Sequence, residues 1–230
     1  MVLTGRKAGE LERLAEEVGG RAVVADLADR ADVARLAEEP VDVLVANAAL
    51  PASGALADFT PEQVARALAV NLEAPIALAH ALAPSMVAAG RGHLVLVGSL
   101  AGKVASAYSS LYNATKFGLR GFALGLREEL HGTGVGVSVV QPGFVRDAGM
   151  FADTGAKPPA GMRTVSPEQV ARGVLDAIEH DRGEVNVAPP EMRAISVLGG
   201  AFPALSAALQ RRMSNDELMR RMGTANQGKR

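Results

Sequence analysis

Short apolar segments alternate along this chain with longer segments in which apolar residues recur every three or four positions. The short segments are typical of buried strands, and the longer ones of amphipathic helices. Strands and helices that alternate in this way predict a parallel sheet covered by helices. The strands are expected at 2–4, 21–25, 41–46, 93–97, 136–140 and 184–187, and the helices at 9–18, 30–38, 61–89, 106–131 and from 167 onward.

Two of the expected helices have clear start signals. Thr60-Pro61 and Ser166-Pro167 each place a capping hydroxyl before a proline, which is tolerated in the first turn, and acidic residues follow. The first of these helices should be long, and Pro75 and Pro84 are positions where it can kink. The Gly- and Pro-rich segment 143–163 predicts a mobile loop over the site.

Composition narrows the class of protein. The 230 residues suit one α/β domain, and 48% hydrophobic with only 3% aromatic residues predicts a core of Ala, Val and Leu. The net charge of −1 gives no electrostatic reason to expect nucleic acid or an anionic membrane as a partner. The absence of cysteine excludes disulfides and thiolate metal sites, and the four histidines have no metal-ligand spacing, so no metal is expected.

The sequence also bears on where the protein is located. The first seven residues do not form a signal peptide, and no uninterrupted apolar run has the length of a membrane span. We therefore expect a cytoplasmic protein without stable membrane insertion.

The candidate chemistry centres on Tyr112 and Lys116, which are four residues apart and so neighbours on one helical face. A cation beside a phenol favours the phenolate, so Lys116 is expected to lower the pKa of Tyr112 and make it a proton donor and acceptor near neutral pH. Ser99 follows the expected strand 93–97. The carboxyl ends of parallel strands are where open α/β sheets hold their ligands.

Further segments agree in order and spacing with these residues: Ala46-Asn47-Ala48-Ala49 after one strand, Asn71 within a helix, and Pro142-Gly143 after another strand. Together they resemble the short-chain dehydrogenase/reductase family. The resemblance implies a Rossmann-like doubly wound parallel sheet in a single domain. It covers residues 1–190 as an NAD(P)-binding catalytic domain, with 191–230 as a C-terminal helical extension of the same domain.

The resemblance also implies the roles of the catalytic residues. Ser99 would hold the substrate carbonyl oxygen, and Tyr112 would transfer the proton. Lys116 would lower the pKa of Tyr112 and bind the nicotinamide ribose. Asn71 would distort its helix so that a backbone carbonyl holds a water near Lys116. Tyr108, one helical turn before Tyr112, is expected in the pocket wall.

The segments after two of the strands are expected to contact the cofactor, by the same resemblance. Asn47 would pin the turn after its strand, and Ala48 and Ala49 would let the adenosine side of the cofactor approach. Pro142, Gly143 and Val145 would pass close to the nicotinamide.

The adenosine side of the cofactor has its own expected contacts. Asp26 and Leu27 would lie at the adenine, although Asp26 could equally cap the following helix. Arg6 would bind a ribose 2′-phosphate, so NADP is preferred over NAD.

The family's opening segment has no counterpart here. Family members begin with a strand and a T-G-x-x-x-G-x-G turn, whereas 2–6 matches the end of the family's second strand. The first βα unit is therefore expected to be missing, through either a start codon assigned too late or a true truncation. The family's 3-2-1-4-5-6-7 order would lose its central strand. The strands ending at Thr4 and Ala46 should then flank an empty slot or close together, and 1–230 should bind no dinucleotide measurably and be poorly folded.

The function expected from the sequence is hydride transfer between NADP(H) and a ketone or secondary alcohol, in a homodimer or homotetramer. One alternative is a non-catalytic fragment or pseudoenzyme unable to bind dinucleotide. Another is a sensor of the cofactor ratio, against which the intact Ser99, Tyr112 and Lys116 argue. The apolar residues in 195–209 indicate either a lipophilic substrate or an oligomer contact, and the sequence leaves both open.

Overall fold

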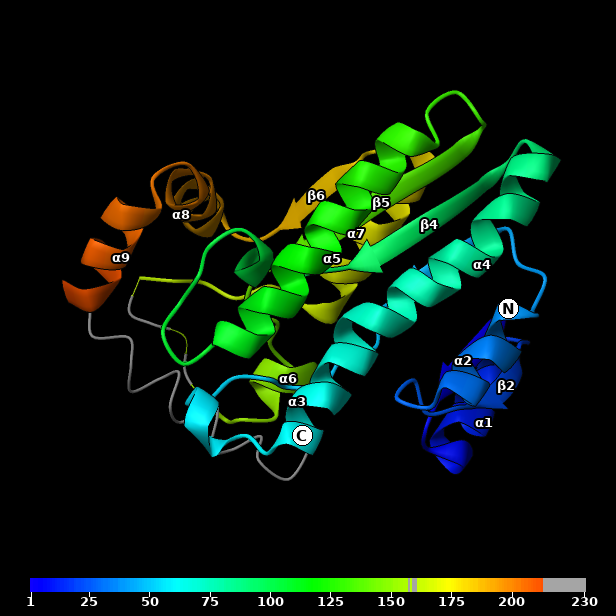
Figure 1. The fold of residues 1–230 in the computed structure, drawn as a ribbon, viewed down its shortest axis with the longest axis horizontal. Helices are drawn as coiled ribbons and strands as arrows, with labels where there is room; N and C mark the ends of the chain where they lie inside the picture. The colour runs from blue at the N-terminus through cyan, green and yellow to red at the C-terminus, as the bar shows by residue number, and fades with distance from the viewer. Residues whose placement is uncertain (157, 159–160, 213–230) are drawn as a thin grey trace.

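The computed structural model describes residues 1–156, 158 and 161–212, and it shows an α/β fold with parallel strands (Figure 1). The strands are β1 (Val2–Gly5), β2 (Arg21–Val24), β3 (Val43–Ala46), β4 (Gly92–Val97), β5 (Val135–Pro142) and β6 (Glu184–Val187). The helices are α1 (Ala8–Glu17), α2 (Arg30–Ala37), α3 (Pro61–Leu68), α4 (Ala74–Ala89), α5 (Ser110–Glu129), α6 (Gly149–Ala152), α7 (Pro167–Glu179), α8 (Pro190–Ala201) and α9 (Pro203–Arg212). Short turns of helix occur at η1 (Leu56–Asp58), η2 (Ala69–Glu73) and η3 (Leu100–Gly102).

The strands form two sheets rather than one. β1 pairs with β2, and β3, β4, β5 and β6 pair in that order, all in parallel. Within the described chain, no ladder joins β1 to β3. The sequence left two arrangements open, in which the strands ending near Thr4 and Ala46 either flank an empty slot or close together. The structure has the first, because these two strands do not pair with each other.

The break leaves one face of β3 uncovered. Val43 and Val45 are 41% and 44% exposed, whereas Leu44 between them packs into the core. Alternate side chains of a strand point to opposite faces of its sheet, so the exposed valines mark a face that no described helix covers.

The four-stranded sheet is the middle of three layers. α4 and α5 pack on one face and α7 on the other. Leu94, Val95 and Leu96 of β4 have no exposed surface, which explains their continuous apolar run, because a parallel strand is buried on both faces. The core is built largely of Ala, Val and Leu, as the composition predicted.

The two-stranded sheet is attached through helices. Val23 of β2 and Val33 of α2 pack against Ala74 and Leu78 of α4, which holds this unit beside α4 (Figure 1). This apolar contact positions the N-terminal unit without strand pairing.

Both predicted helix starts are confirmed. Thr60 and Ser166 each accept a hydrogen bond from the backbone three residues on, and the glutamine at that position bonds back. The long helix expected over 61–89 is continuous but contains a π-helical turn at η2, between α3 and α4.

By length and mean hydropathy Pro61–Ala89 is sufficient to cross a membrane, although no uninterrupted apolar run of that length was found in the sequence. Its buried side chains pack on the sheet, among them Leu82 and Met86 in the core beside β4.

Two other sequence predictions need correction. The helix expected from residue 106 begins at Ser110, because Tyr108 adopts a left-handed conformation with φ of 56°. The segment 143–163 is not wholly loop, since it contains α6 and since Val145 bridges to Val165. Residues 157, 159–160 and 213–230, which belong to the predicted loop and C-terminal extension, lie outside the described part.

Candidate active site

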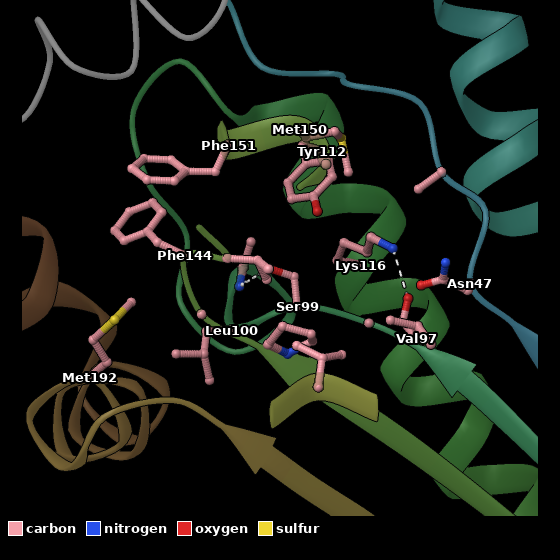
Figure 2. Close-up of a pocket in the computed structure, with 18 of the residues that line it drawn as sticks. Asn47, Val97, Ser99, Leu100, Tyr112, Lys116, Phe144, Met150, Phe151 and Met192 are labelled. Carbon is pink, nitrogen blue, oxygen red and sulfur yellow. Dashed lines mark hydrogen bonds between the residues drawn. The ribbon is translucent and has the colours of Figure 1, made fainter. Parts of the chain in front are cut away.

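Three of the four candidate catalytic residues, Ser99, Tyr112 and Lys116, converge on one cavity at the carboxyl edge of the four-stranded sheet, and Asn71 is outside its lining (Figure 2). Ser99 lies two residues after the end of β4 and caps η3, while Tyr112 and Lys116 lie on α5. The cavity has a volume of about 1130 Å³. Its lining also includes the predicted cofactor residues Asn47, Ala48, Ala49, Pro142, Gly143 and Val145.

Lys116 is buried, and its ammonium is hydrogen-bonded to the protein backbone. Its Nζ donates to the backbone oxygen of Val97 at 2.9 Å and lies 5.8 Å from the centre of the Tyr112 ring (Figure 2). The last residue of β4 therefore fixes the cation beside the phenol. Burial lowers the pKa of Lys116 to about 8, because an ammonium loses its hydration there.

The predicted effect of Lys116 on Tyr112 is wrong for this arrangement. Burial raises the pKa of the Tyr112 phenol, and a hydrogen bond with the Ser99 side chain opposes only part of that rise. Desolvation outweighs the ammonium, which is directed to Val97 rather than to the phenol oxygen. Tyr112 is consequently protonated at neutral pH and is suited to donate a proton to a carbonyl oxygen.

Asn71 lies in η2, the π-helical turn, so the helix is distorted where the resemblance implied. Its side chain is 1% exposed and bonds twice to Leu50, accepting from the amide at 2.6 Å and donating to the carbonyl at 2.9 Å. The segment after β3 is thus pinned by Asn71, whereas the sequence prediction gave that task to Asn47. Asn47 instead has an exposed side chain on the cavity wall.

Of the residues predicted for the adenosine side, Ala48 and Ala49 line this cavity, whereas Arg6, Asp26 and Leu27 are outside its lining. Asp26 accepts from Arg66 of α3 at 2.6 Å, and Arg6 is close enough to help lower the pKa of its carboxyl. Asp26 does not cap α2, because Asp29 holds that position. The cavity therefore brings together the catalytic residues and the segments after β3 and β5, and it leaves Arg6, Asp26 and Leu27 apart.

Asn113, the residue after Tyr112, was missed by the sequence analysis although it shapes the site. It is buried, and its Nδ2 donates to the backbone oxygens of Ala101 and Val104 while its Oδ1 accepts from the amide of Ser106. These bonds hold the turn after Ser99 against α5. A helical Asn carries no local signal of such a role, because its partners depend on the tertiary fold.

A second polar cluster supports the same turn. Glu184 of β6 binds Lys103, just after η3, at 2.5 Å and Arg120, one turn beyond Lys116, at 2.9 Å. Although burial raises the pKa of Glu184, hydrogen bonds from Arg120 and Lys103 bring it below its usual value. Gln141 of β5 also donates to Glu184.

The sequence analysis predicted only some of the residues in the apolar wall of the cavity. Tyr108, predicted in the wall, is absent from the lining. The rings of Phe144 and Phe151 lie there with centroids 4.7 Å apart. The apolar residues in segments 143–163 and 195–209 were the features of the sequence that indicated an apolar wall. Their position around Tyr112 could not be predicted from the sequence alone. Other apolar lining residues are Met150, Met162, Val170, Val174, Leu175, Met192 and Ile195.

Comparison with known proteins bears on the identity of this fold and site. A ketoacyl reductase, HetN, from Nostoc sp. is 39% identical over 148 residues, which cover 64% of this chain and 52% of that protein. Dehydrogenase/reductase SDR family member 7B from Bos taurus is 31% identical over 214 residues, covering 83% of this chain and 66% of that protein. The chain thus spans between about half and two thirds of the length of these curated relatives.

Solved structures of similar proteins also match this chain. A short-chain dehydrogenase from Sphingobium yanoikuyae in complex with NADPH superposes with a TM-score of 0.73 at 28% identity, covering 93% of this chain and 85% of that one. The family profile described as short chain dehydrogenase matches residues 1–159. The α/β fold, the order of its site residues and these matches together establish that the chain belongs to the short-chain dehydrogenase/reductase family.

Proposed function

We propose that the cavity is the active site of an NADP(H)-dependent oxidoreductase that interconverts a ketone and a secondary alcohol. The observation that carries this proposal is the convergence of Ser99, Tyr112 and Lys116 on one cavity, beside Asn47 and the end of β5. The bound nicotinamide would supply or accept the hydride at the carbonyl carbon.

The residues on one side of the cavity fit such a cofactor. Asn47, Ala48 and Ala49 present small or amide side chains after β3, and Pro142 at the end of β5 and Gly143 after it line the same cavity. Small side chains allow a planar ring to lie close to the backbone. Lys116 can exchange its bond with Val97 for one to a ribose hydroxyl, since an ammonium has three donors.

Proton transfer is assigned to Tyr112. In the direction of reduction, the Ser99 hydroxyl donates to the substrate oxygen and Tyr112 gives that oxygen its proton. The raised pKa of the phenol suits this step, because the proton is present at neutral pH. In oxidation the phenol oxygen must first be deprotonated, and the charge of Lys116 nearby favours this.

The proposal is tested in a chimera in which the first strand, glycine-rich turn and helix of a family member precede Met1, because β1 and β3 have no strand between them. NADPH deuterated at its reactive carbon should transfer deuterium to the carbonyl carbon of a ketone, as detected by mass spectrometry. A chimera that binds NADPH but transfers no deuterium to any ketone contradicts the proposed activity.

The preference for NADP is proposed from Arg6, which is exposed just after β1. In the chimera, NADPH should bind more tightly than NADH by roughly 1 to 3 kcal/mol if Arg6 bonds to the 2′-phosphate. Arg6→Ala should remove most of that difference, whereas Arg13→Ala, at an exposed position on α1, should preserve it. Equal affinities of the chimera for both cofactors, measured by nicotinamide fluorescence, would refute the assignment to Arg6.

A second candidate function is a protein of this fold that binds no dinucleotide. The observation that favours it is the break between β1 and β3, with Arg6 and Asp26 outside the cavity. The chimera distinguishes the two candidates: an oxidoreductase binds NADPH and transfers its deuterium to a ketone, whereas a protein that binds no dinucleotide does neither.

A further inference from the structure

The cavity has a polar side and an apolar side, with Ser99 and Tyr112 between them (Figure 2). Asn47 and Lys116 lie on one side of this pair. Aromatic and thioether side chains from the end of β5, from α6 and from α8 lie on the other. The labelled residues on the apolar side are Phe144, Phe151 and Met192.

The apolar side offers no partner to a charged ligand. Among the described residues that line the cavity there is no Asp, Glu, Arg or His, and Lys116 is the one cation. Three cations near the lining bond elsewhere: Arg163 binds Glu191 at 2.9 Å, Lys103 binds Glu184, and Arg193 donates to the backbone oxygen of Ala188 at 2.6 Å. A carboxylate placed there would lose its hydration without compensation, which is costly.

The apolar wall continues to the surface along α8. Ile195 lines the cavity and is 42% exposed, and Val197 and Leu198, which follow on the same helix, are each 60% exposed. Met192, one turn earlier, packs so closely that a Cβ on Gly143 would lie 3.2 Å from its Sδ and Cε. α8 therefore forms an apolar rim from the surface to the residues beside Tyr112.

We propose that the substrate of this site is an uncharged ketone, or its alcohol, with a bulky hydrophobic body that lies between α6, α7 and α8. This inference rests on the proposed function, since it places the carbonyl oxygen at Ser99 and Tyr112. The volume of about 1130 Å³ exceeds the roughly 300 to 1,000 Å³ usual for a site of one small ligand, so a bulky body fits beside the cofactor. A substrate with a carboxylate on its body is excluded by the lack of a cation on the apolar side.

The test measures binding to the full chain, without cofactor, by saturation-transfer NMR and calorimetry at pH 7. The probes are methyl oxoundecanoate and free oxoundecanoic acid, each with its ketone at the next-to-last carbon, so that they differ in charge at the opposite end. We expect the ester to bind and the acid to bind at least about tenfold more weakly, because its carboxylate has no partner. Equal binding of ester and acid, or no binding of either, overturns the inference.

Substitutions on α8 test where the hydrophobic body of the substrate binds. Met192→Lys should weaken binding of the ester by about tenfold or more and strengthen that of the acid, because an ammonium then faces the apolar side. Ala194→Lys is the matched control, since Ala194 is exposed on the same helix outside the cavity lining, and it should change neither affinity by more than about twofold. An unaltered ester-to-acid ratio in Met192→Lys contradicts the placement of the body.

Failure of the inference and failure of the proposed function give different results. If the ester binds selectively and the NADPH-bound chimera still does not reduce it, the binding preference stands and the oxidoreductase activity fails. If the chimera reduces a small ketone such as butanone, and the acid binds as well as its ester, the activity stands and the substrate class fails.

Discussion

Asn113 donates from Nδ2 to the backbone oxygen of Ala101 at 2.6 Å, and this bond ties α5 to the turn that follows Ser99. The same amide also bonds to Val104 and Ser106. Because Tyr112 precedes Asn113 on the helix, the distance between the Tyr112 phenol and the Ser99 hydroxyl depends on these bonds. Asn113 is therefore a positioning residue for the two groups that would hold the substrate oxygen.

Asn113→Ala is expected to lower kcat of the chimera by about tenfold or more, because small displacements of catalytic groups are costly. The KM for NADPH should stay unchanged, since Asn113 does not line the cavity. The free energy of unfolding should fall by about 1 to 3 kcal/mol as backbone groups lose their partner. Ala114→Ser, at the exposed neighbouring position, is the control. A normal kcat in a destabilised Asn113→Ala variant would show that the bonds serve stability alone.

The buried ammonium of Lys116 makes stability depend on pH. Its pKa falls from 10.5 to about 8 on folding, which costs about 3 kcal/mol when the group is charged. The folded state releases this proton near pH 8 while the unfolded state keeps it to about 10.5, so stability rises with pH across that interval.

Lys116→Met should therefore raise the free energy of unfolding at pH 7 by about 2 kcal/mol, after loss of the bond to Val97 is subtracted. The gain should disappear between pH 8 and 10.5. Urea unfolding across this range measures it, with exposed Lys7→Met as the control. A pH-independent difference between wild type and Lys116→Met would mean that the ammonium is not desolvated.

Much of the fold was predictable from local patterns. The continuous apolar run of β4 and the caps at Thr60 and Ser166 carry their signal within a few residues. The convergence of Ser99, Tyr112 and Lys116 also followed from strand order, because carboxyl ends of parallel strands share one edge.

The remainder depended on contacts between distant residues. The pKa of Tyr112 was predicted in the wrong direction, because the spacing of Tyr112 and Lys116 does not show that burial dominates or that the ammonium bonds to Val97. Asp26 was expected at the adenine, with a helix cap as a compatible alternative, but Asp29 caps α2 and Asp26 pairs with Arg66, 40 residues away. No local pattern encodes such a pair.

The break between β1 and β3 predicts that residues 1–230 bind dinucleotide too weakly to measure. A pyrophosphate needs backbone donors at a helix N-terminus beside the cavity. α1 follows β1 through Arg6 and Lys7 rather than through a glycine-rich turn, and Arg6 lies outside the lining. The midpoint of thermal unfolding should therefore be unchanged by millimolar NADPH. A cooperative transition that rises with NADPH concentration would show that this chain is competent as it stands.

The central claim is that the Tyr112 hydroxyl carries the proton in hydride transfer at this cavity. It is tested most directly by the single-turnover rate of ketone reduction in the NADPH-bound chimera, with and without Tyr112→Phe. The rate should fall by about 10²- to 10⁴-fold, while the NADPH affinity of the variant stays within about twofold of the parent. An undiminished rate in Tyr112→Phe would contradict the account.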